Sequence, residues 1–282
     1  MTSIAEALKH AHDVLSDSGV SDPRRESVSL LAHALKKDKT FLYAHPEDAL
    51  SSEERSLFDS YLERRAGREP FQYITGVQEF YGLEFEVTPD VLIPRPETEM
   101  VVEQALKIFD GSDAPRFCEV GVGSGCISVS ILHHIRDASA VAVDVSGSAL
   151  DVTRRNAMRH RVEERLTLIE SDIFDRLTDH EFDAIVSNPP YVPVLDFAGL
   201  QAEVRDFEPH LALTDGSDGL SIIRCIIDES PRFLRSNGFL LMEIGFDQSE
   251  KVATMFDRTV WTSPDLLPDL QGIPRLVSAR LK

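Results

Sequence analysis

The chain has few cysteines and no long apolar run. Its three cysteines, Cys118, Cys126 and Cys225, are odd in number, widely spaced and form no C-x-x-C motif. This pattern argues against a disulfide framework or a zinc site and is typical of a reducing compartment. No apolar run approaches the roughly 20 residues of a membrane span, and residues 1–9 lack the basic flank and apolar block of a signal peptide. We therefore expect a cytoplasmic protein with no membrane partner and no bound metal.

Basic residues are also scarce. The chain carries 29 Lys and Arg against 48 Asp and Glu, a formal net charge of -19. Affinity for DNA or RNA depends on Lys and Arg contacts to phosphates, so direct nucleic-acid binding is not expected, although an acidic protein can carry a local basic patch. Hydrophobic residues make up 42% of the 282 residues, enough for a sizeable core and two modest domains. The sequence shows no internal repeat, P-loop or Ser-His-Asp arrangement.

The first 70 residues have the pattern of a small helical bundle. Ser51-x-x-Glu54 is a capping box, and Asp22 followed by Pro23 suits the start of another helix. Apolar residues recur at helical spacing. We expect these apolar residues to form the core of the bundle: Ile4, Leu8, Ala11, Leu15, Val28, Leu31, Leu35, Leu57, Phe58, Tyr61 and Leu62. We take residues 1–70 as the first domain and assign substrate recognition to it.

A β-hairpin linker is predicted at residues 71–90. The stretch 71–87 carries aromatic and β-branched side chains, with Gly76 and Gly82 as turn points. A composition of this kind is typical of the two strands of a hairpin.

The second domain, residues 91–282, is predicted to be of the α/β class. Pro94 and Pro96 make its first segment rigid and non-helical, and a helix begins after it. Strands and helices then alternate, which indicates a parallel, doubly wound sheet. We expect strands at 117–120, 140–143, 166–169, 182–187 and 238–244, an edge strand at 276–281, and helices at 126–135, 148–160 and 220–234.

A glycine-rich turn, residues 121–125, follows the first strand of this domain and opens a helix. Glycines there let the backbone turn tightly and a ligand approach it. Asp144 ends the next strand, where a carboxylate can accept both ribose hydroxyls. Because Cys126 stands where a dinucleotide fingerprint has its third glycine, the turn fits S-adenosylmethionine better than a nicotinamide cofactor. Asp172, after the third strand, either accepts the amino group of adenine or caps a following helix.

The motif Ser187-Asn188-Pro189-Pro190-Tyr191 follows the fourth strand, at the carboxyl edge where open sheets bind ligands. The prolines hold the backbone and remove two N–H donors. The side-chain oxygen of Asn188 and the carbonyl of Pro189 are left as paired acceptors, which suit a substrate NH2 group. Tyr191 offers a flat face to an amide or a base. Holding both hydrogens aims a weakly nucleophilic amide nitrogen at a methyl donor, and such placement contributes about 7–11 kcal/mol of the barrier.

Further segments join these motifs into a family pattern. They are Arg64-Arg65, residues 69–76, Phe80-Tyr81-Gly82, residues 92–99, Glu208-Pro209, and Glu243-Ile244-Gly245 with Gln248. With them the sequence resembles the release-factor glutamine methyltransferases, the HemK/PrmC family, over nearly its whole length. The resemblance implies a Rossmann-like class I methyltransferase fold with a seven-stranded, mostly parallel sheet, behind a helical bundle and a β-hairpin linker. The implied reaction is N5-methylation, from S-adenosylmethionine, of the Gln in the Gly-Gly-Gln loop of peptide chain release factors, by a monomer.

By position, the resemblance also implies site residues. The cofactor would be held by Gly121, Val122, Gly123, Ser124, Gly125, Asp144, Asp172, Ile173 and Asn188. The substrate Gln would be held by Asn188, Pro189, Pro190 and Tyr191, of which Asn188 and Pro189 are the catalytic pair. The chain departs from the family pattern at Glu119, Val122 and Pro274. The resemblance leaves open the roles of Arg95, Glu97, Glu208 and Glu243.

Four other functions compete with this one. A sibling enzyme would methylate a Gln of a ribosomal protein, and residues 93–99 favour the release-factor branch. An adenine amino-methyltransferase would have to extract its base from the stack, at a cost of a few kcal/mol, and the acidic balance disfavours it. A nicotinamide oxidoreductase is disfavoured by the missing third glycine, and a non-catalytic adaptor by the intact Asn-Pro-Pro-Tyr motif.

Overall fold

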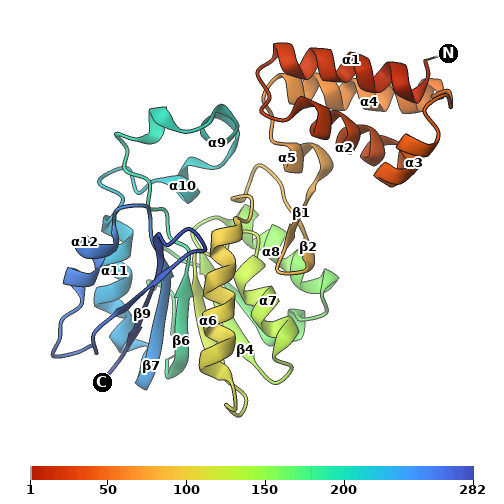
Figure 1. The fold of residues 1–282 in the computed structure, drawn as a ribbon. Coiled ribbons are helices and arrows are strands. Elements are labelled where there is room, and N and C mark those ends of the chain that lie inside the picture. The colour runs from red at the N-terminus through yellow and green to blue at the C-terminus, as the bar shows by residue number, and fades with distance from the viewer. Residues whose placement is uncertain (1, 179) are drawn as a thin grey trace. The chain divides into compact units, whose positions relative to one another are not determined.

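The chain forms two units. The computed structural model describes residues 2–178 and 180–282 (Figure 1). One unit comprises the chain up to Val77 together with Gln201–Phe207, and the other comprises Gln78–Leu200 and Glu208–Lys282. Within the described ranges, no helix combines the length and the apolar character that a bilayer span requires.

The first unit is the expected helical bundle. Its helices are α1 (Ile4–Asp17), α2 (Pro23–Leu35), α3 (Lys39–Ala44), α4 (Ser52–Ala66), α5 (Phe71–Thr75) and, from the distant segment, α9 (Ala202–Phe207). Asp22 caps α2 by accepting a hydrogen bond from the Arg25 N–H, and Ser51 and Glu54 form the capping box of α4. The predicted stripes pack as one core, with Leu57 as the exception at 40% exposure.

The predicted hairpin linker is shorter than expected. Residues 71–75 form helix α5, and Gly76 ends that helix in the left-handed conformation, with φ 76°. The hairpin itself is β1 (Val77–Phe80) and β2 (Leu83–Glu86), turning at Gly82, with φ 74°. The aromatic composition of residues 71–75 reflects burial of Tyr73 and Ile74 in the structure, which a helix provides as well as a strand.

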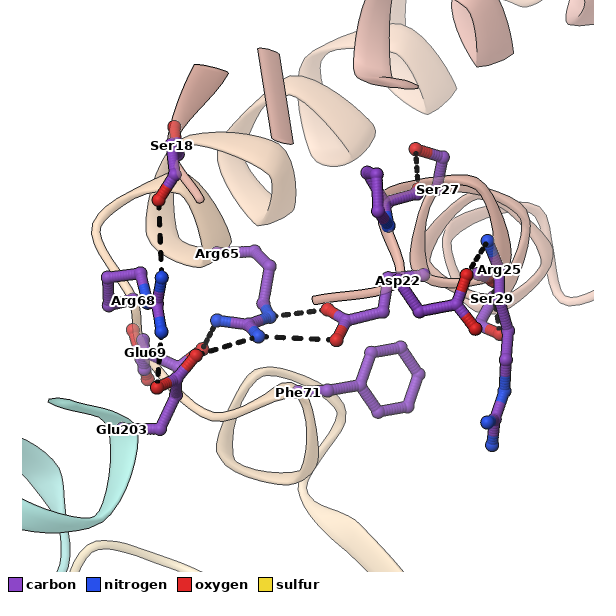
Figure 2. A network of polar contacts seen from close by, with 12 residues as sticks. Ser18, Asp22, Arg25, Ser27, Ser29, Arg65, Arg68, Glu69, Phe71 and Glu203 are labelled. Atoms are coloured by element: carbon purple, nitrogen blue, oxygen red, sulfur yellow. Dashed lines mark hydrogen bonds and ion pairs between the residues drawn. The ribbon is translucent and has the colours of Figure 1, made fainter. Parts of the chain in front are cut away.

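A charged network holds the distant segment Gln201–Phe207 in the helical unit (Figure 2). Arg65 on α4 is 4% exposed and pairs with Glu26 on α2 and, at 3.1 Å, with Glu203 on α9. Arg68 donates to the other Glu203 oxygen at 2.7 Å and to the Gly19 carbonyl at 2.7 Å. Two guanidinium groups are therefore paired with two carboxylates around the buried Arg65, although the Nε of Arg68 has no partner among the described residues.

We expect Arg65→Ala to lower the unfolding free energy of the helical unit by about 3 kcal/mol, because it leaves the half-buried Glu26 carboxylate unpaired. The matched control, Arg55→Ala, breaks a pair with Asp59 that is more exposed than the pairs of Arg65 and should cost about 1 kcal/mol or less. Far-UV circular dichroism in guanidinium reports the helices of both units, so a change in its transition that tryptophan fluorescence does not share is assigned to the helical unit. The single tryptophan, Trp261, is buried in the other unit, and its fluorescence should keep its midpoint. Equal effects of the two substitutions would contradict a buried network.

The second unit is built on a seven-stranded sheet of order β5-β4-β3-β6-β7-β9-β8. Its strands are β3 (Arg116–Val120), β4 (Ser139–Asp144), β5 (Leu166–Glu170), β6 (Phe182–Ser187), β7 (Leu234–Glu243), β8 (Asp265–Pro268) and β9 (Pro274–Arg280). Strands β3 to β7 are parallel, and β9 is antiparallel to β7 and β8. The predicted doubly wound, mostly parallel fold is confirmed.

Helices cover both faces of this sheet (Figure 1). On one face lie α6 (Glu99–Phe109), α7 (Cys126–His134) and α8 (Gly147–Arg159), and on the other lie α11 (Ser221–Glu229) and α12 (Ser249–Met255). A short helix, α10 (His210–Leu213), precedes α11. Alternate residues of the strands enter the two cores, Phe117 one and Cys118 the other, as burial on both faces requires.

The C-terminal part of the second unit differs from the prediction. The C-terminal strand β9 is not an edge strand, because β8 pairs on its outer side. Helix α11 ends at Glu229 and not at residue 234, because Pro231 follows and cannot donate the next backbone hydrogen bond. A 3-10 turn completes the connection, and β7 begins at Leu234.

Candidate active site

The predicted site residues gather at the carboxyl edge of the parallel strands. The order of strands reverses between β3 and β6, and such a switch point opens a crevice outside the strand ends. A cavity of about 190 Å³ lies there. Its lining includes these predicted residues: Gly121, Val122, Gly123, Ser124, Asp144, Asp172, Ile173, Asn188, Pro189 and Pro190. Gly125 and Tyr191 do not line it.

The glycine turn needs its glycines for different reasons. Gly121, Gly123 and Gly125 all have positive φ, at 74°, 54° and 82°, where a side chain is strained. A Cβ on Gly123 would meet nothing within 4 Å, whereas one on Gly125 would lie 2.8 Å from Cγ2 of Thr153. The first two glycines therefore serve the turn, and the third also allows helix α8 to pack closely.

Asp144, at the end of β4, retains capacity to bind a ligand. One carboxylate oxygen accepts from the Gly123 N–H and the other from the Ser146 N–H, each at 2.9 Å. An ionised carboxylate has about four acceptor positions, so about two are left for groups in the cavity. Burial raises the pKa of the Asp144 carboxyl, and hydroxyl donors from a ligand would favour its charged form. The geometry fits the ribose of a nucleoside.

The residues after β5 form a strained turn at the cavity. Residues 171–178 make turns and no helix, so the helix-cap interpretation of Asp172 is wrong. Ile173 has φ 46°, which is rare for a β-branched residue and concentrates at ligand sites. The cavity is also lined by the apolar side chains of Val145, Ile222 and Ile226. Such a lining suits a planar base with one polar edge.

Asn188 is held by a chain of buried hydrogen bonds. Its Nδ2 donates to Oγ1 of Thr98 at 3.0 Å, and the Thr98 hydroxyl donates to Oε2 of Glu243 at 2.6 Å. The Tyr191 hydroxyl donates to the other Glu243 oxygen at 3.0 Å. One amide hydrogen of Asn188 is thereby engaged on the protein side, which orients the side chain and leaves its Oδ1 as an acceptor at the cavity.

Burial raises the pKa of Glu243 to about 7, against the hydrogen bonds from Thr98 and Tyr191, which lower it. Burial and the Glu243 charge also raise the pKa of the Tyr191 phenol, so this group donates as a neutral hydroxyl. Tyr191 was expected to cover the substrate with its ring. The structure places its hydroxyl on Glu243 and its backbone at the motif, so its role toward a substrate stays a prediction.

Close backbone contacts support the Asn-Pro-Pro-Tyr turn. Gln248 donates to the Tyr191 carbonyl at 2.9 Å and accepts from the Gly245 N–H at 2.8 Å. A Cβ on Gly219 would lie 2.2 Å from the Tyr191 carbonyl oxygen, and one on Gly245 would lie 3.1 Å from the Tyr191 ring. Two glycines and one amide therefore set the position of the turn.

Arg95 and Glu208 hold the proline-rich segment in place within the second unit. Glu208 is 3% exposed and accepts from Arg95 at 2.5 Å and from the Ile93 N–H at 3.2 Å. Burial raises the pKa of the Glu208 carboxyl, and Arg95 opposes that rise. This pair keeps residues 93–98 at the edge of the sheet, where Thr98 reaches Asn188.

A second buried carboxylate, Glu119, lines the cavity at the end of β3. It accepts from the Ser128 N–H at 2.9 Å, and burial raises its pKa to about 8, with a smaller contribution from Asp144. A cationic group in the cavity would stabilise its ionised form. The ionised carboxylate of Glu119 can therefore pair with the ammonium group of a cofactor bound in the cavity.

Sequence reasoning missed two supporting residues. Thr98 stood in the recognised segment 92–99 without an assigned role. Asn156, on α8, is fully buried and joins the Ser124 carbonyl to both backbone groups of Glu86 in the hairpin. Nothing local marks an asparagine in a helix as such a link, because its partners are 32 and 70 positions away.

The fold and this site define a class of protein. A parallel sheet with a glycine turn after its first strand, an acid after its second and a polar proline-rich turn after its fourth belongs to a Rossmann-like methyltransferase. The family model described as "Methyltransferase small domain" matches residues 101–200. A solved methyltransferase from Pyrococcus furiosus shares the fold, with a TM-score of 0.51 and 15% identity, over 82% of this chain and 99% of that one.

The chain belongs to the release factor glutamine methyltransferase family. The model described as "PrmC N-terminal domain" matches residues 6–76. The release factor glutamine methyltransferase of Geobacter sulfurreducens is 43% identical over 99% of this chain and 96% of its own length. That of Cereibacter sphaeroides is 41% identical over 98% of each chain.

Proposed function

We propose that the chain transfers the methyl group of S-adenosylmethionine to the side-chain nitrogen N5 of the Gln in the Gly-Gly-Gln loop of peptide chain release factors. The observation that carries this proposal is the orientation of Asn188. Its Nδ2 is engaged by Thr98, so its oxygen, with the Pro189 carbonyl, can accept both hydrogens of a primary amide. The helical unit recognises the release factor, and the enzyme acts as a cytoplasmic monomer.

The donor and acceptor sites adjoin at the edge of the sheet. A Cβ on Gly121 of the cofactor turn would lie 4.0 Å from the backbone oxygen of Asn188. The residues that would hold S-adenosylmethionine are the turn 121–125, Asp144, Asp172, Ile173 and Asn188, with the buried Glu119 beside them. When bound, this cofactor supplies an electrophilic methyl group on a sulfonium, so the protein needs no strong base.

The protein's own contribution is placement. Asn188 and Pro189 accept the two amide hydrogens and thereby orient the nitrogen lone pair, which delocalisation into the carbonyl otherwise weakens. Orientation of this kind contributes about 7–11 kcal/mol of a barrier. The proton leaves the nitrogen late, to solvent.

The test uses S-adenosylmethionine labelled in its methyl group and purified release factor. Label should appear in wild-type release factor and be absent when the loop Gln is replaced by Ala. Ribosomal proteins and DNA are run beside it. Transfer to either of these with none to release factor would overturn the proposal in favour of the corresponding alternative.

Asp144→Ala should weaken S-adenosylmethionine binding by about 1.5–3 kcal/mol, because hydrogen bonds to a charged group are lost. Isothermal calorimetry measures the affinity. Asp137→Ala, an exposed acid before the start of the same strand, at the opposite edge of the sheet, serves as the matched control and should bind normally. Unchanged affinity in Asp144→Ala would remove this residue from the cofactor site.

A further inference from the structure

The hydrogen bonds around Thr98 have a direction that the charge on Glu243 imposes. Thr98 and Glu243 are 1% and 2% exposed, so solvent does not supply alternative partners. An ionised carboxylate only accepts, so the single hydroxyl hydrogen of Thr98 points to Glu243. The Thr98 oxygen can then only accept from Asn188, whose NH2 group must face it.

We propose that Thr98 and Glu243 are positioning residues for methyl transfer, in which ionised Glu243, acting through the Thr98 hydroxyl, holds the Asn188 amide with its oxygen toward the substrate NH2 group. This inference rests on the proposed function and deepens it. Protonated Glu243 can donate to Thr98, whose hydroxyl then turns to Asn188. The Asn188 amide rotates, and its NH2 group meets the substrate NH2 group, donor against donor.

The charge on Glu243 therefore decides whether Asn188 presents its oxygen, an acceptor, or its NH2 group, a donor, to the substrate NH2 group. Burial is the largest influence on the pKa of Glu243; hydrogen bonds from Thr98 and Tyr191 and the charge of Arg275 on β9 lower it, and Glu97 before α6 raises it. Burial also raises the pKa of the Cys126 thiol on α7, and the charge on Glu243 adds to that rise. Because the pKa of Glu243 is about 7, the carboxyl is protonated below neutral pH and ionised above it. Methyl transfer should fall as the pH drops through this value.

The first test removes the hydroxyl of Thr98. Thr98→Val keeps the side-chain shape and should lower kcat for release-factor methylation by about tenfold to a hundredfold. The affinity for S-adenosylmethionine should stay within about twofold, since Thr98 acts through Asn188. Thr98→Ser, which keeps the hydroxyl, should recover most of the lost kcat. A purely structural role for the methyl group would give the reverse order, with Val active and Ser impaired.

The second test uses the pH profile of kcat at saturating S-adenosylmethionine, so that titration of Glu119 does not enter through cofactor binding. Wild-type kcat should decline on the acid side with an apparent pKa near 7. Glu243→Gln has no proton to gain and can still accept from Thr98, so its profile should lose that acid limb. Tyr191→Phe removes the other hydrogen bond to Glu243, a bond that lowers the Glu243 pKa, so this variant should keep the acid limb and shift it to higher pH.

The outcomes separate this inference from the proposed function. No transfer by the wild-type enzyme to release factor would remove the function itself. Active wild-type enzyme with an unchanged kcat in Thr98→Val, or with an acid limb that survives in Glu243→Gln, would overturn the positioning role alone. Should Thr98→Val fail to fold, the Glu243→Gln profile decides the question.

Discussion

Asn188→Ala is expected to lower kcat for methyl transfer to release factor by at least about 10²–10³-fold, the range seen when one preorganised polar contact to a reacting group is removed. The physical reason is geometric. Without the Asn188 oxygen, one amide hydrogen of the substrate has no acceptor, and the nitrogen lone pair is no longer aimed at the methyl group. Initial rates with labelled S-adenosylmethionine measure the effect.

The control for Asn188→Ala must show that the variant has lost only the orientation of the substrate amide. Calorimetry should find S-adenosylmethionine still bound, with a smaller loss of affinity than in Asp144→Ala, because Asp144 and the glycine turn are unchanged. Gln271→Ala removes an exposed carboxamide elsewhere in the same unit and should be fully active. Normal turnover by Asn188→Ala would refute its assignment as a catalytic residue.

Gly219→Ala should cause a comparable loss of at least about 10²-fold in kcat, since a displacement of about 1 Å at a reacting group is enough for that. The new Cβ would lie 2.2 Å from the Tyr191 carbonyl oxygen and 3.1 Å from the Pro193 nitrogen. Both atoms belong to the backbone, so the Asn-Pro-Pro-Tyr turn itself must move. Steady-state kinetics with release factor test the expectation.

Gly216→Ala is the matched control for Gly219→Ala. Both glycines have φ 73°, but a Cβ on Gly216 meets nothing within 4 Å. Both substitutions therefore carry the cost of a left-handed residue, about 1–2 kcal/mol of stability, and only Gly219→Ala displaces the turn. Similar kcat values for the two variants would show that the close contact with Tyr191 has no catalytic importance.

These predicted effects all depend on one arrangement, in which residues from four distant segments fix the position and orientation of the Asn188 side-chain amide. Glu208 and Arg95 hold the proline-rich segment, that segment carries Thr98, and Gln248 holds the turn that carries Tyr191. Substitutions among them are expected to be non-additive, because each acts through the same group. A cycle combining Thr98→Val with Asn188→Ala should show almost no additional loss over Asn188→Ala.

Several expectations from sequence were local and were confirmed. The caps at Asp22 and Ser51, the glycine turn after β3 and the parallel alternation of strands and helices all depend on residues within a few positions of one another. The predictions failed where the local sequence pattern favours one structure and the packing of distant segments favours another. Residues 71–75 have strand-like composition and form α5, and the apolar run at the C-terminus pairs on both sides because β8 joins it.

The amino-acid sequence by itself determined the α/β class, the family, and the residue types of the site: a glycine turn, an acid after the second strand and Asn-Pro-Pro-Tyr after the fourth. Only the tertiary structure decided how Asn188 is oriented. Its link to Thr98 spans 90 positions, and the link from Thr98 to Glu243 spans 145. Such partners meet because β6 and β7 pair in the register Ser187 with Met242, which places Glu243 beside Asn188. A sequence pattern can specify which groups donate and accept, but the direction of a hydrogen bond is settled only when the fold brings its two partners together.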